Sequence, residues 1–248
     1  MSSPDASLRE RSCRVVVLAK QPRAGSVKTR LCPPFSHAEA AQLALAALAD
    51  TLAAVRSAVP LAHSREHRLD PVLALDGRPG AWLDALRVEA PVTLRVIAQR
   101  SGTLDARIAG AFRDATTGSA GSRTFLIGMD TPQVTPEILV DAIDELCAAN
   151  TDAVMGLAED GGWWGLGLNR PAASLILGVP TSTPHTGRDQ HDRLTAAGLQ
   201  VTALPMLRDV DTAADAHHVA ALVPDSRFAS TLARLSIQRV PALLAATA

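Results

Sequence analysis

Short apolar runs alternate with amphipathic stretches along most of this chain, and that alternation limits the folds open to it. The runs predict strands at 15–18, 72–75, 92–98, 125–128, 153–157, 164–168 and 201–204. The stretches between them predict helices from Ser36 onward, at 80–88, at 104–115, from Thr135 onward, at 191–197 and at 213–222. Strands that alternate with helices favour an α/β fold with a single Rossmann-like, mostly parallel open sheet and helices on both of its faces.

Length and composition exclude several classes of protein. The 248 residues suit one α/β domain over 1–248, with a flexible stretch at 1–12. The formal net charge is −1, so no bulk electrostatic field attracts nucleic acid. Aromatic residues make up 3% and Tyr is absent, which argues against a surface that stacks nucleobases. We therefore expect small-molecule partners, and any phosphate must bind at a local site.

The cysteine pattern and the chain ends indicate a cytoplasmic protein. The three cysteines show no Cys-x-x-Cys spacing, so we expect neither a disulfide framework nor a structural zinc site. Residues 1–11 lack the apolar core of a signal peptide, and the apolar stretch at 240–245 is too short to span a bilayer. We expect no membrane span, and the alanine-rich helices leave room for a homo-oligomer.

A basic loop over 19–34 follows the first predicted strand. In open α/β sheets, ligands bind at the carboxyl ends of the strands, which is where this loop lies. Gly25 permits an unusual turn, and Lys28 and Arg30 can meet phosphate oxygens. The loop has neither the second glycine of a Walker A motif nor a G-x-G-x-x-G pattern. These features predict a phosphate site of another type, with a solvated basic loop as the alternative.

Aspartates at two later strand ends are candidate metal ligands. Asp130 ends the strand at 125–128 in a turn closed by Pro132, a setting that suits Mg²⁺ or Mn²⁺. Such a metal would neutralise a substrate diphosphate and a departing phosphate. Asp130 could equally cap the turn. We expect Asp209 to face the same strand ends, whereas Asp211 or Thr212 caps the next helix.

The turn at 159–164 offers groups for a second substrate. Its glycines, Gly161 and Gly162, let a backbone approach a ligand closely. Asp160 could bind a metal or a sugar. Trp163 could form a stacking wall, although large aromatic residues more often pack in a core.

The segment at 182–188 combines hydroxyl groups with a histidine and an arginine shortly before a predicted helix. That setting suits an acceptor or a phosphate. His185 is a candidate catalytic residue, although a lone histidine is more often structural.

Together, these stretches resemble the nucleotide-diphospho-sugar transferase superfamily, which has a glycosyltransferase-A-like fold. The matching motifs are Ala19-Lys20 through Lys28-Thr29-Arg30-Leu31, Gly128-Met129-Asp130-Thr131-Pro132, Asp160-Gly161-Gly162-Trp163-Trp164, Ser182-Thr183 and Arg208-Asp209-Val210-Asp211-Thr212. The likeness is greatest to a bacterial branch of uncharacterised glycosyltransferases. The first motif is also similar to molybdopterin and 2-phospholactate guanylyltransferases.

The resemblance implies a metal-dependent transferase that moves a sugar from a nucleotide-diphospho-sugar to a small acceptor. The residues it implies at the nucleotide and its phosphates are Lys20, Gly25, Lys28, Arg30 and Gly128. Those on the acceptor side are Gly161, Gly162, Trp163, Ser182, Thr183 and Arg188. The catalytic candidates are Asp130, Asp160 and His185, and the candidate ligands of Mg²⁺ or Mn²⁺ are Asp130 and Asp209.

One departure from the family pattern concerns the metal. Many glycosyltransferases of this fold carry Asp-x-Asp, whereas Asp130 is followed by Thr131 and Pro132. A second carboxylate must therefore come from elsewhere, from Asp160 or Asp209. Two other functions stay open: nucleotidyl transfer to a phosphorylated small molecule, and a catalytically silent nucleotide-binding module.

Overall fold

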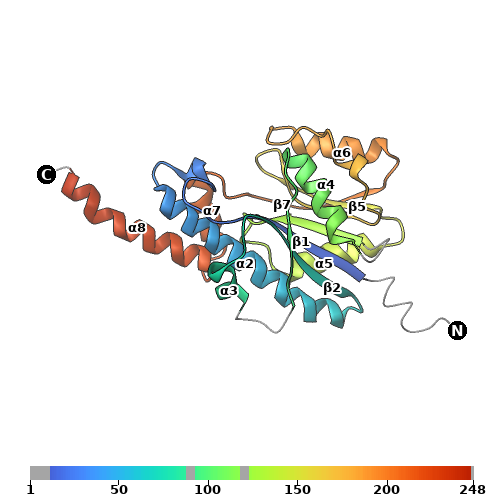
Figure 1. The fold of residues 1–248 in the computed structure, drawn as a ribbon, viewed down its shortest axis with the longest axis horizontal. Coiled ribbons are helices and arrows are strands. Elements are labelled where there is room, and N and C mark those ends of the chain that lie inside the picture. Colours follow the sequence, from blue (N-terminus) through green and yellow to red (C-terminus); the bar gives the residue numbers. More distant parts are fainter. Residues whose placement is uncertain (1–11, 88–92, 118–122, 247–248) are drawn as a thin grey trace.

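A computed structural model describes residues 12–87, 93–117 and 123–246 (Figure 1). Its strands are β1 Ser12–Lys20, β2 Arg68–Asp76, β3 Arg95–Ala98, β4 Arg123–Gly128, β5 Ala153–Ala158, β6 Trp163–Leu168 and β7 Val201–Leu207. They form one seven-stranded sheet in the order β3-β2-β1-β4-β6-β5-β7. Among these strands only β6 runs against the others, since it pairs antiparallel with both β4 and β5. The predicted α/β class and mostly parallel open sheet are confirmed.

Helices cover both faces of this sheet (Figure 1). They are α2 His37–Ser64, α3 Ala81–Arg87, α4 Leu104–Ala115, α5 Pro136–Cys147, α6 Thr186–Ala196, α7 Ala213–Leu222 and α8 Arg227–Ala246, with short 3-10 helices η1 Thr29–Leu31 and η2 Ala173–Leu175. Helices α2, α3 and α5 pack on one face, and α4 and α6 pack on the other. The predicted helix at 191–197 in fact begins at Thr186.

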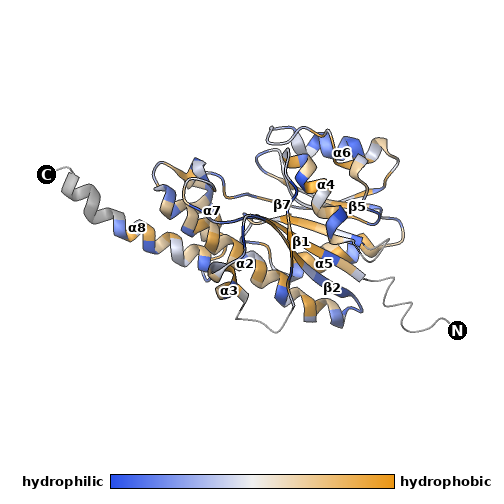
Figure 2. Ribbon diagram, in the orientation of Figure 1, coloured by the Kyte–Doolittle hydropathy of each residue, from blue (hydrophilic) through white to orange (hydrophobic). Residues whose placement is uncertain are grey.

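The core follows from the period-two alternation of strand side chains. In β1, Val15 and Val17 point into the cluster under α2 and α5, whereas Val16 points into the cluster under α4 and α6. Figure 2 shows the apolar colour concentrated on the strands and on the helix faces that cover them. A strand buried on both faces reads as a continuous apolar run, which is why β1 was recognisable in the sequence.

Capping residues begin the helices where the sequence predicts. Ser36 and Glu39 form the expected capping box at α2, and the Thr135 side chain accepts a hydrogen bond from the backbone N–H of Ile138 at α5. At α7 the cap is Thr212, which forms a capping box with Asp215. The alternative that Asp211 caps α7 is therefore wrong, and the Asp211 carboxylate is available for other contacts.

Helix α8 is an element that the sequence reading missed. Phe228, Leu232 and Leu235 pack with residues of α2 and α7, with Leu31 after β1, and with Val210 after β7. Their spacing is helical, so the signal was present in the sequence. Figure 1 shows α8 continuing outward beyond the body of the protein. Its packed half supports the two segments that carry Lys28 and Asp209.

Helix α2 is the one helix among the described residues that is long and apolar enough to cross a membrane. Its apolar composition has another explanation here, because 61% of the most apolar window is buried inside the protein. The buried side chains face β1, β2, α5 and α8.

Candidate functional site

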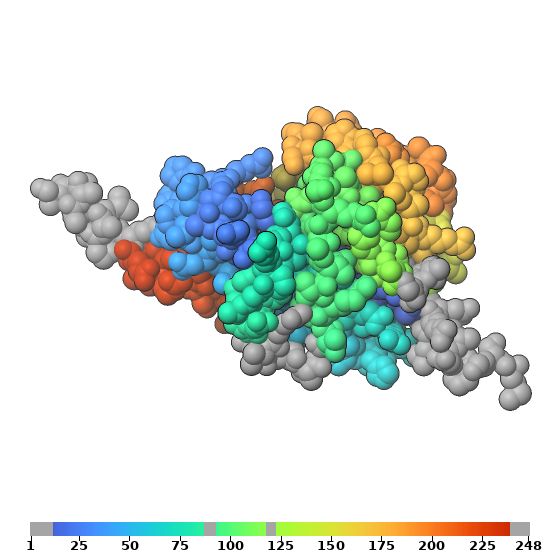
Figure 3. All heavy atoms as spheres, in the orientation of Figure 1, coloured from blue at the N-terminus to red at the C-terminus, as the bar shows by residue number. Residues whose placement is uncertain are grey.

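Two adjoining cavities lie at the carboxyl edge of the sheet. The larger cavity has a volume of about 590 Å³ and the smaller cavity about 340 Å³. The walls of both include Arg30, Met129, Asp130, Ser182 and Asp211. Figure 3 shows a hollow here, between the blue N-terminal segment and the green and orange segments. The five shared residues therefore mark the junction between the two cavities.

The basic loop after β1 forms one wall of the smaller cavity. Lys20, Lys28 and Arg30 all line it. Lys28 has a φ of 48°, a left-handed conformation that is uncommon for a residue other than glycine. Strained residues of this kind often occur at functional sites. The predicted concentration of cations at a strand end is thus present in three dimensions.

Lys28 joins two carboxylates from distant parts of the chain. Its Nζ lies 2.7 Å from Asp130 Oδ2 and 2.8 Å from Asp211 Oδ1, and its side chain is 13% exposed. Burial alone would lower the pKa of Lys28, but the two carboxylates outweigh it and raise that pKa. Arg30 Nη1 also contacts Asp211, at 3.1 Å. Burial would raise the pKa of Asp211, but Lys28 and Arg30 lower it.

Backbone contacts fasten the end of β7 to the turn that carries Asp130. The Val210 N–H donates to the Asp130 carbonyl oxygen at 3.0 Å, and Gln133 Nε2 donates to the Arg208 carbonyl oxygen at 2.6 Å. A Cβ on Gly128 would lie 2.5 Å from Asp130 Oδ1, so a larger residue there would displace this carboxylate oxygen. The expectation that Asp209 and Asp130 share one edge of the sheet agrees with these contacts.

Among the carboxyl groups of the site, Asp209 has the most strongly shifted pKa. Burial, together with the negative charges of Asp130 and Asp160, raises the pKa of Asp209 to about 8, although Lys28 opposes this. Its Oδ1 atom is buried and has no hydrogen-bond partner. A buried acceptor without a partner is costly, which indicates that a cation or a donor group completes the site.

The turn between β5 and β6 is pressed against the segment before α6. Gly161 has a φ of 89°, and a Cβ there would lie 2.0 Å from the Pro184 carbonyl oxygen. The Gly187 N–H donates to the Gly161 carbonyl oxygen at 2.8 Å. One oxygen of Asp160 accepts the Gly162 N–H at 2.8 Å. The paired glycines thus bring two parts of the chain together, and Gly162 and Asp160 line the larger cavity.

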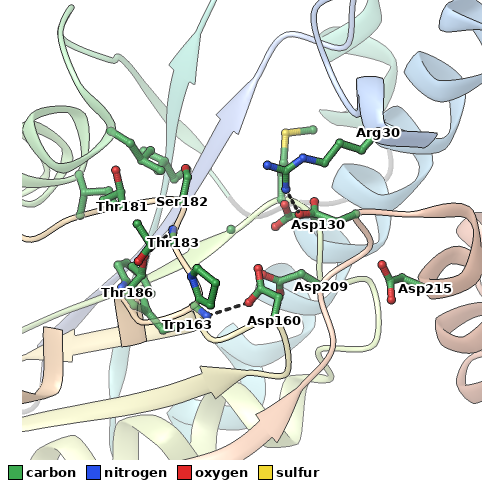
Figure 4. A pocket seen from close by; sticks show the side chains of 18 of the residues that line it. Arg30, Asp130, Asp160, Trp163, Thr181, Ser182, Thr183, Thr186, Asp209 and Asp215 are labelled. Atoms are coloured by element: carbon green, nitrogen blue, oxygen red, sulfur yellow. Dashed lines mark hydrogen bonds and ion pairs between the residues drawn. The ribbon is translucent and has the colours of Figure 1, made fainter. Parts of the chain in front are cut away.

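Hydroxyl groups form the side of the larger cavity opposite the cations. Figure 4 shows Thr181, Ser182, Thr183 and Thr186 on one side, Arg30 and Asp130 on the other, and Asp160 and Asp209 between them. Ser182 has a φ of 60°, so both cavity segments hold a residue in the left-handed region.

The two tryptophans of the turn have different environments. Trp163 lines the larger cavity and is half-buried. Trp164 is 1% exposed, donates from Nε1 to the Pro205 carbonyl oxygen, and packs edge-on against Phe125. Trp164 is therefore a core residue, and Trp163 is the one placed to contact a ligand.

Several predicted site residues do not line either cavity. Gly25 has a φ of 75° and shapes the basic loop without lining the smaller cavity. His185 is exposed at the start of α6, and the exposed Arg188 lies 3.8 Å from Asp189. The structure gives His185 and Arg188 no contact with either cavity, so their roles stay predictions without geometric support.

The sequence reading also missed residues that the fold brings to the site. The sequence reading took Asp211 only as a helix cap. Asp211 follows the end of β7, as Asp209 does, and that position could have marked it as a site residue too. The apolar end of the larger cavity comes from β1, β4 and α4, with Leu18, Leu126, Leu104 and Ile108. Apolar residues in strands and helices look like core residues, so no local signal marks these four.

The residues present fit a divalent cation only in part. No group of three or more His, Cys, Asp or Glu side chains is arranged to hold a metal ion within 12–87, 93–117 and 123–246. Asp130 and Asp209 nevertheless lie in electrostatic reach of each other, and Asp209 Oδ1 has no partner. Mg²⁺ in nucleotide sites commonly uses one or two carboxylates and takes its other ligands from phosphate and water. The site suits that mode of binding.

Comparisons with known proteins place this geometry in context. The model of the bacterial family described as "Uncharacterized protein conserved in bacteria (DUF2064)" matches residues 60–183. No curated protein matches the chain.

Solved structures share the fold. A candidate nucleotide-diphospho-sugar transferase from Desulfovibrio desulfuricans G20 is 24% identical with a TM-score of 0.73, over 93% of this chain and 96% of that one. A 4-diphosphocytidyl-2C-methyl-D-erythritol synthase from Anaerococcus prevotii DSM 20548 is 9% identical with a TM-score of 0.57, over 88% and 99%. A nucleotidyl transferase from Methanothermobacter thermautotrophicus is 15% identical with a TM-score of 0.52, over 86% and 98%. At these identities the likeness shows the fold alone.

Proposed function

This chain belongs to the DUF2064 family of bacterial proteins, and from its site we propose that it is a metal-dependent transferase that uses a nucleotide-activated donor. The favoured reaction is glycosyl transfer from a nucleotide-diphospho-sugar to a small acceptor. One observation carries the proposal. Three cations gather in the smaller cavity, and Asp130 lies at its junction with the larger cavity. A diphosphate bound to those cations would place its far end at the junction.

The cations of the smaller cavity would hold the donor phosphates. Lys20, Lys28 and Arg30 offer charge-assisted hydrogen bonds to phosphate oxygens. Lys28 now neutralises Asp130 and Asp211, so a diphosphate would compete with those carboxylates for its ammonium group. Arg30 is 70% exposed and can reach an incoming ligand at little structural cost.

A divalent cation would complete the charge balance. We assign it to Asp130 and Asp209, with donor phosphate oxygens and water as the remaining ligands. When bound, it would supply electrophilic stabilisation of the departing nucleoside diphosphate. The residues themselves would hold the phosphates and orient the transferred sugar between Asp160 and the hydroxyl groups of Ser182 and Thr183.

The direct test is calorimetric titration of the full chain with UDP-, GDP-, dTDP- and ADP-sugars, with and without Mn²⁺. We expect one of these donors to bind, and to bind at least tenfold more tightly with Mn²⁺. Absence of binding for every donor would contradict the proposal. If a donor binds but Asp130→Ala leaves the Mn²⁺ dependence unchanged, the assigned metal site is wrong, and the alternative of a catalytically silent nucleotide-binding module gains support.

Nucleotidyl transfer is the second candidate reaction, because one of the proteins that share the fold is named a nucleotidyl transferase. In it, an acceptor phosphate attacks the α-phosphorus of a nucleoside triphosphate and pyrophosphate leaves. The test is pyrophosphate release from the four ribonucleoside triphosphates with phosphorylated small acids. Release with any pair would favour this reaction, and none, in a protein that binds nucleotide-sugars, would exclude it.

A further inference from the structure

We infer that the larger cavity selects an acceptor with a hydroxyl group on an apolar body and with neither a phosphate nor a carboxylate. The inference rests on the proposed function in one respect, namely that this cavity is the acceptor side. It goes further by naming the chemical class of the acceptor. It also separates the two candidate reactions, because nucleotidyl transfer of the kind described above needs a phosphorylated acceptor.

The charges are divided unevenly between the two cavities. Among the described residues, the cations Lys20 and Lys28 line only the smaller cavity. Of the cations in the described part of the chain, only Arg30, at the junction, also lines the larger cavity. Five carboxylates line that larger cavity: Asp130, Asp160, Asp209, Asp211 and Asp215. An anionic acceptor would therefore enter a region that already carries negative charge.

Ion pairs neutralise only part of this charge. Lys28 and Arg30 are bound to Asp130 and Asp211, and Asp215 Oδ1 lies 3.1 Å from Arg208 Nη1. Asp160 and Asp209 have no ion-pair partner in the part of the chain that the structure describes. Asp209 Oδ1 also lacks any hydrogen bond.

Binding of the metal and the donor would not make the net charge of the larger cavity positive. A divalent cation would offset the charges of Asp160 and Asp209 once both are ionised. The donor diphosphate would then add negative charge at the junction, and its phosphates would occupy Lys20, Lys28 and Arg30. Among the described residues that line the two cavities, no cation would be left for a phosphate or carboxylate on the acceptor. Carboxylates that no cation neutralises repel an anionic ligand at close range, and this repulsion lowers its affinity.

The remaining walls describe what the cavity accepts. Leu18 and Leu126 from the sheet and Leu104 and Ile108 from α4 give it an apolar end. The hydroxyl groups of the 181–186 segment lie across the cavity from Arg30 and Asp130, and the Asp160 carboxylate lies between the two sides (Figure 4). The Gly162 N–H uses one Asp160 oxygen, which leaves the other for a hydroxyl or ammonium group of the ligand. A ligand with a polar head and an apolar body matches this arrangement.

Three probes of equal length and different charge test the inference. They are 1,6-hexanediol, 6-amino-1-hexanol and 6-hydroxyhexanoic acid, titrated at pH 9.0, where Asp209 is ionised, into the full chain without donor and followed by tryptophan fluorescence and by saturation-transfer NMR. We expect the amino alcohol to bind at least as well as the diol, and the acid to bind at least tenfold more weakly than the diol. Equal or tighter binding of the acid, or no binding of any probe, would overturn the inference.

A charge-removing variant checks that the selection comes from this cavity. In Asp160→Asn we expect the ratio of amino-alcohol to acid affinity to shrink at least fivefold, because one of the two unpaired carboxylates is gone. Asp141→Asn, on the far side of the sheet, is the matched control and should leave the ratio unchanged. An unchanged ratio in Asp160→Asn would also overturn the inference.

Failure of the proposed function would look different. The probes are measured without donor, so their order can hold in a protein that binds no nucleotide-sugar. In that case only the transferase proposal fails. Conversely, donor binding together with a preference for the acid would refute the acceptor class alone.

Discussion

Two charged clusters lie at opposite edges of the same sheet, and they have different consequences. At the amino edge, Arg65 Nη1 lies 2.7 Å from Asp141 Oδ1 and 2.6 Å from Asp144 Oδ2, and His67 Nε2 lies 2.6 Å from Asp144 Oδ1. This amino-edge cluster joins the end of α2 and the start of β2 to α5. At the carboxyl edge, Lys28, Arg30, Asp130, Asp209 and Asp211 form the second cluster.

The two clusters share features that are often taken as marks of function. Each has a residue in the left-handed region, Glu66 in the amino-edge cluster and Lys28 in the carboxyl-edge cluster. Each also has a buried polar atom without a hydrogen bond, His67 Nδ1 and Asp209 Oδ1 respectively. Backbone strain and an unpaired atom therefore do not identify a site by themselves.

The two clusters differ in whether a cavity adjoins them and in whether they hold more carboxylates than their cations neutralise. Neither cavity reaches the amino-edge cluster, whereas both meet at the carboxyl-edge cluster. At the carboxyl edge, Asp209 and the nearby Asp160 add carboxylates beyond those that the cations neutralise. The amino-edge cluster holds elements together, and the carboxyl-edge cluster has capacity for a ligand.

The largest expected effect is a loss of turnover that occurs for a variant in the carboxyl-edge cluster and not for one in the amino-edge cluster. Asp130→Asn should lower Mn²⁺-dependent donor turnover by about a hundredfold to a thousandfold, because electrostatic stabilisation at the leaving group is lost. Thermal unfolding should change little. Asp141→Asn in the amino-edge cluster is the matched control and should keep full turnover. Comparable loss of turnover in both variants would remove the distinction between the clusters.

The next effect concerns stability and donor binding together. Lys28→Met should lower the free energy of unfolding by about 2 kcal/mol, because Asp130 and Asp211 lose a largely buried partner. It should also weaken nucleoside diphosphate binding at least tenfold. Urea unfolding and calorimetry measure the two quantities. A variant that keeps donor affinity would show that Lys28 is structural, like Arg65.

A pH effect distinguishes a ligand site from a structural one. The folded-state pKa of Asp209 is raised to about 8 from an ordinary 3.8, so the native state holds a proton that the unfolded state releases. Asp209 therefore costs stability increasingly as the pH rises from about 4 to about 8. Asp209→Asn should remove this cost and stabilise the protein at pH 9 by roughly 1–3 kcal/mol relative to wild type.

The difference between Asp209→Asn and wild type should nearly vanish at pH 4, and chemical unfolding at several pH values measures it. Mn²⁺ binding should be lost in the same variant. A stability difference that does not depend on pH would show that Asp209 is not protonated in the native state.

The smallest effect belongs to the amino-edge cluster. His67→Gln should lower the free energy of unfolding by about 1 kcal/mol, because the buried contact with Asp144 is weakened. Donor and Mn²⁺ binding should stay at wild-type values. A change in donor affinity here would mean that the two edges are coupled through α5, and the comparison would need revision.

The sequence alone was sufficient for the class of fold and for the segments that form the site. Strands buried on both faces are continuous apolar runs, and helix caps use a few residue types, so β1, β4, α2 and α5 could be predicted locally. The rule that ligands bind at the carboxyl ends of strands then pointed to the loops that carry Lys28, Asp130 and Asp160.

Only the tertiary structure decided which residues act together. Whether Asp211 caps α7 or binds Lys28 depends on an ion pair across 183 positions of the chain, and sequence spacing carries no information about such a contact. The same holds for Trp163 and Trp164, where neighbouring positions on a strand face a cavity and a core. The charge division between the cavities also arises from packing, because its carboxylates come from separate segments and its apolar end from β1, β4 and α4. Local patterns predict elements, whereas a site is made of long-range contacts that exist only after those elements have packed.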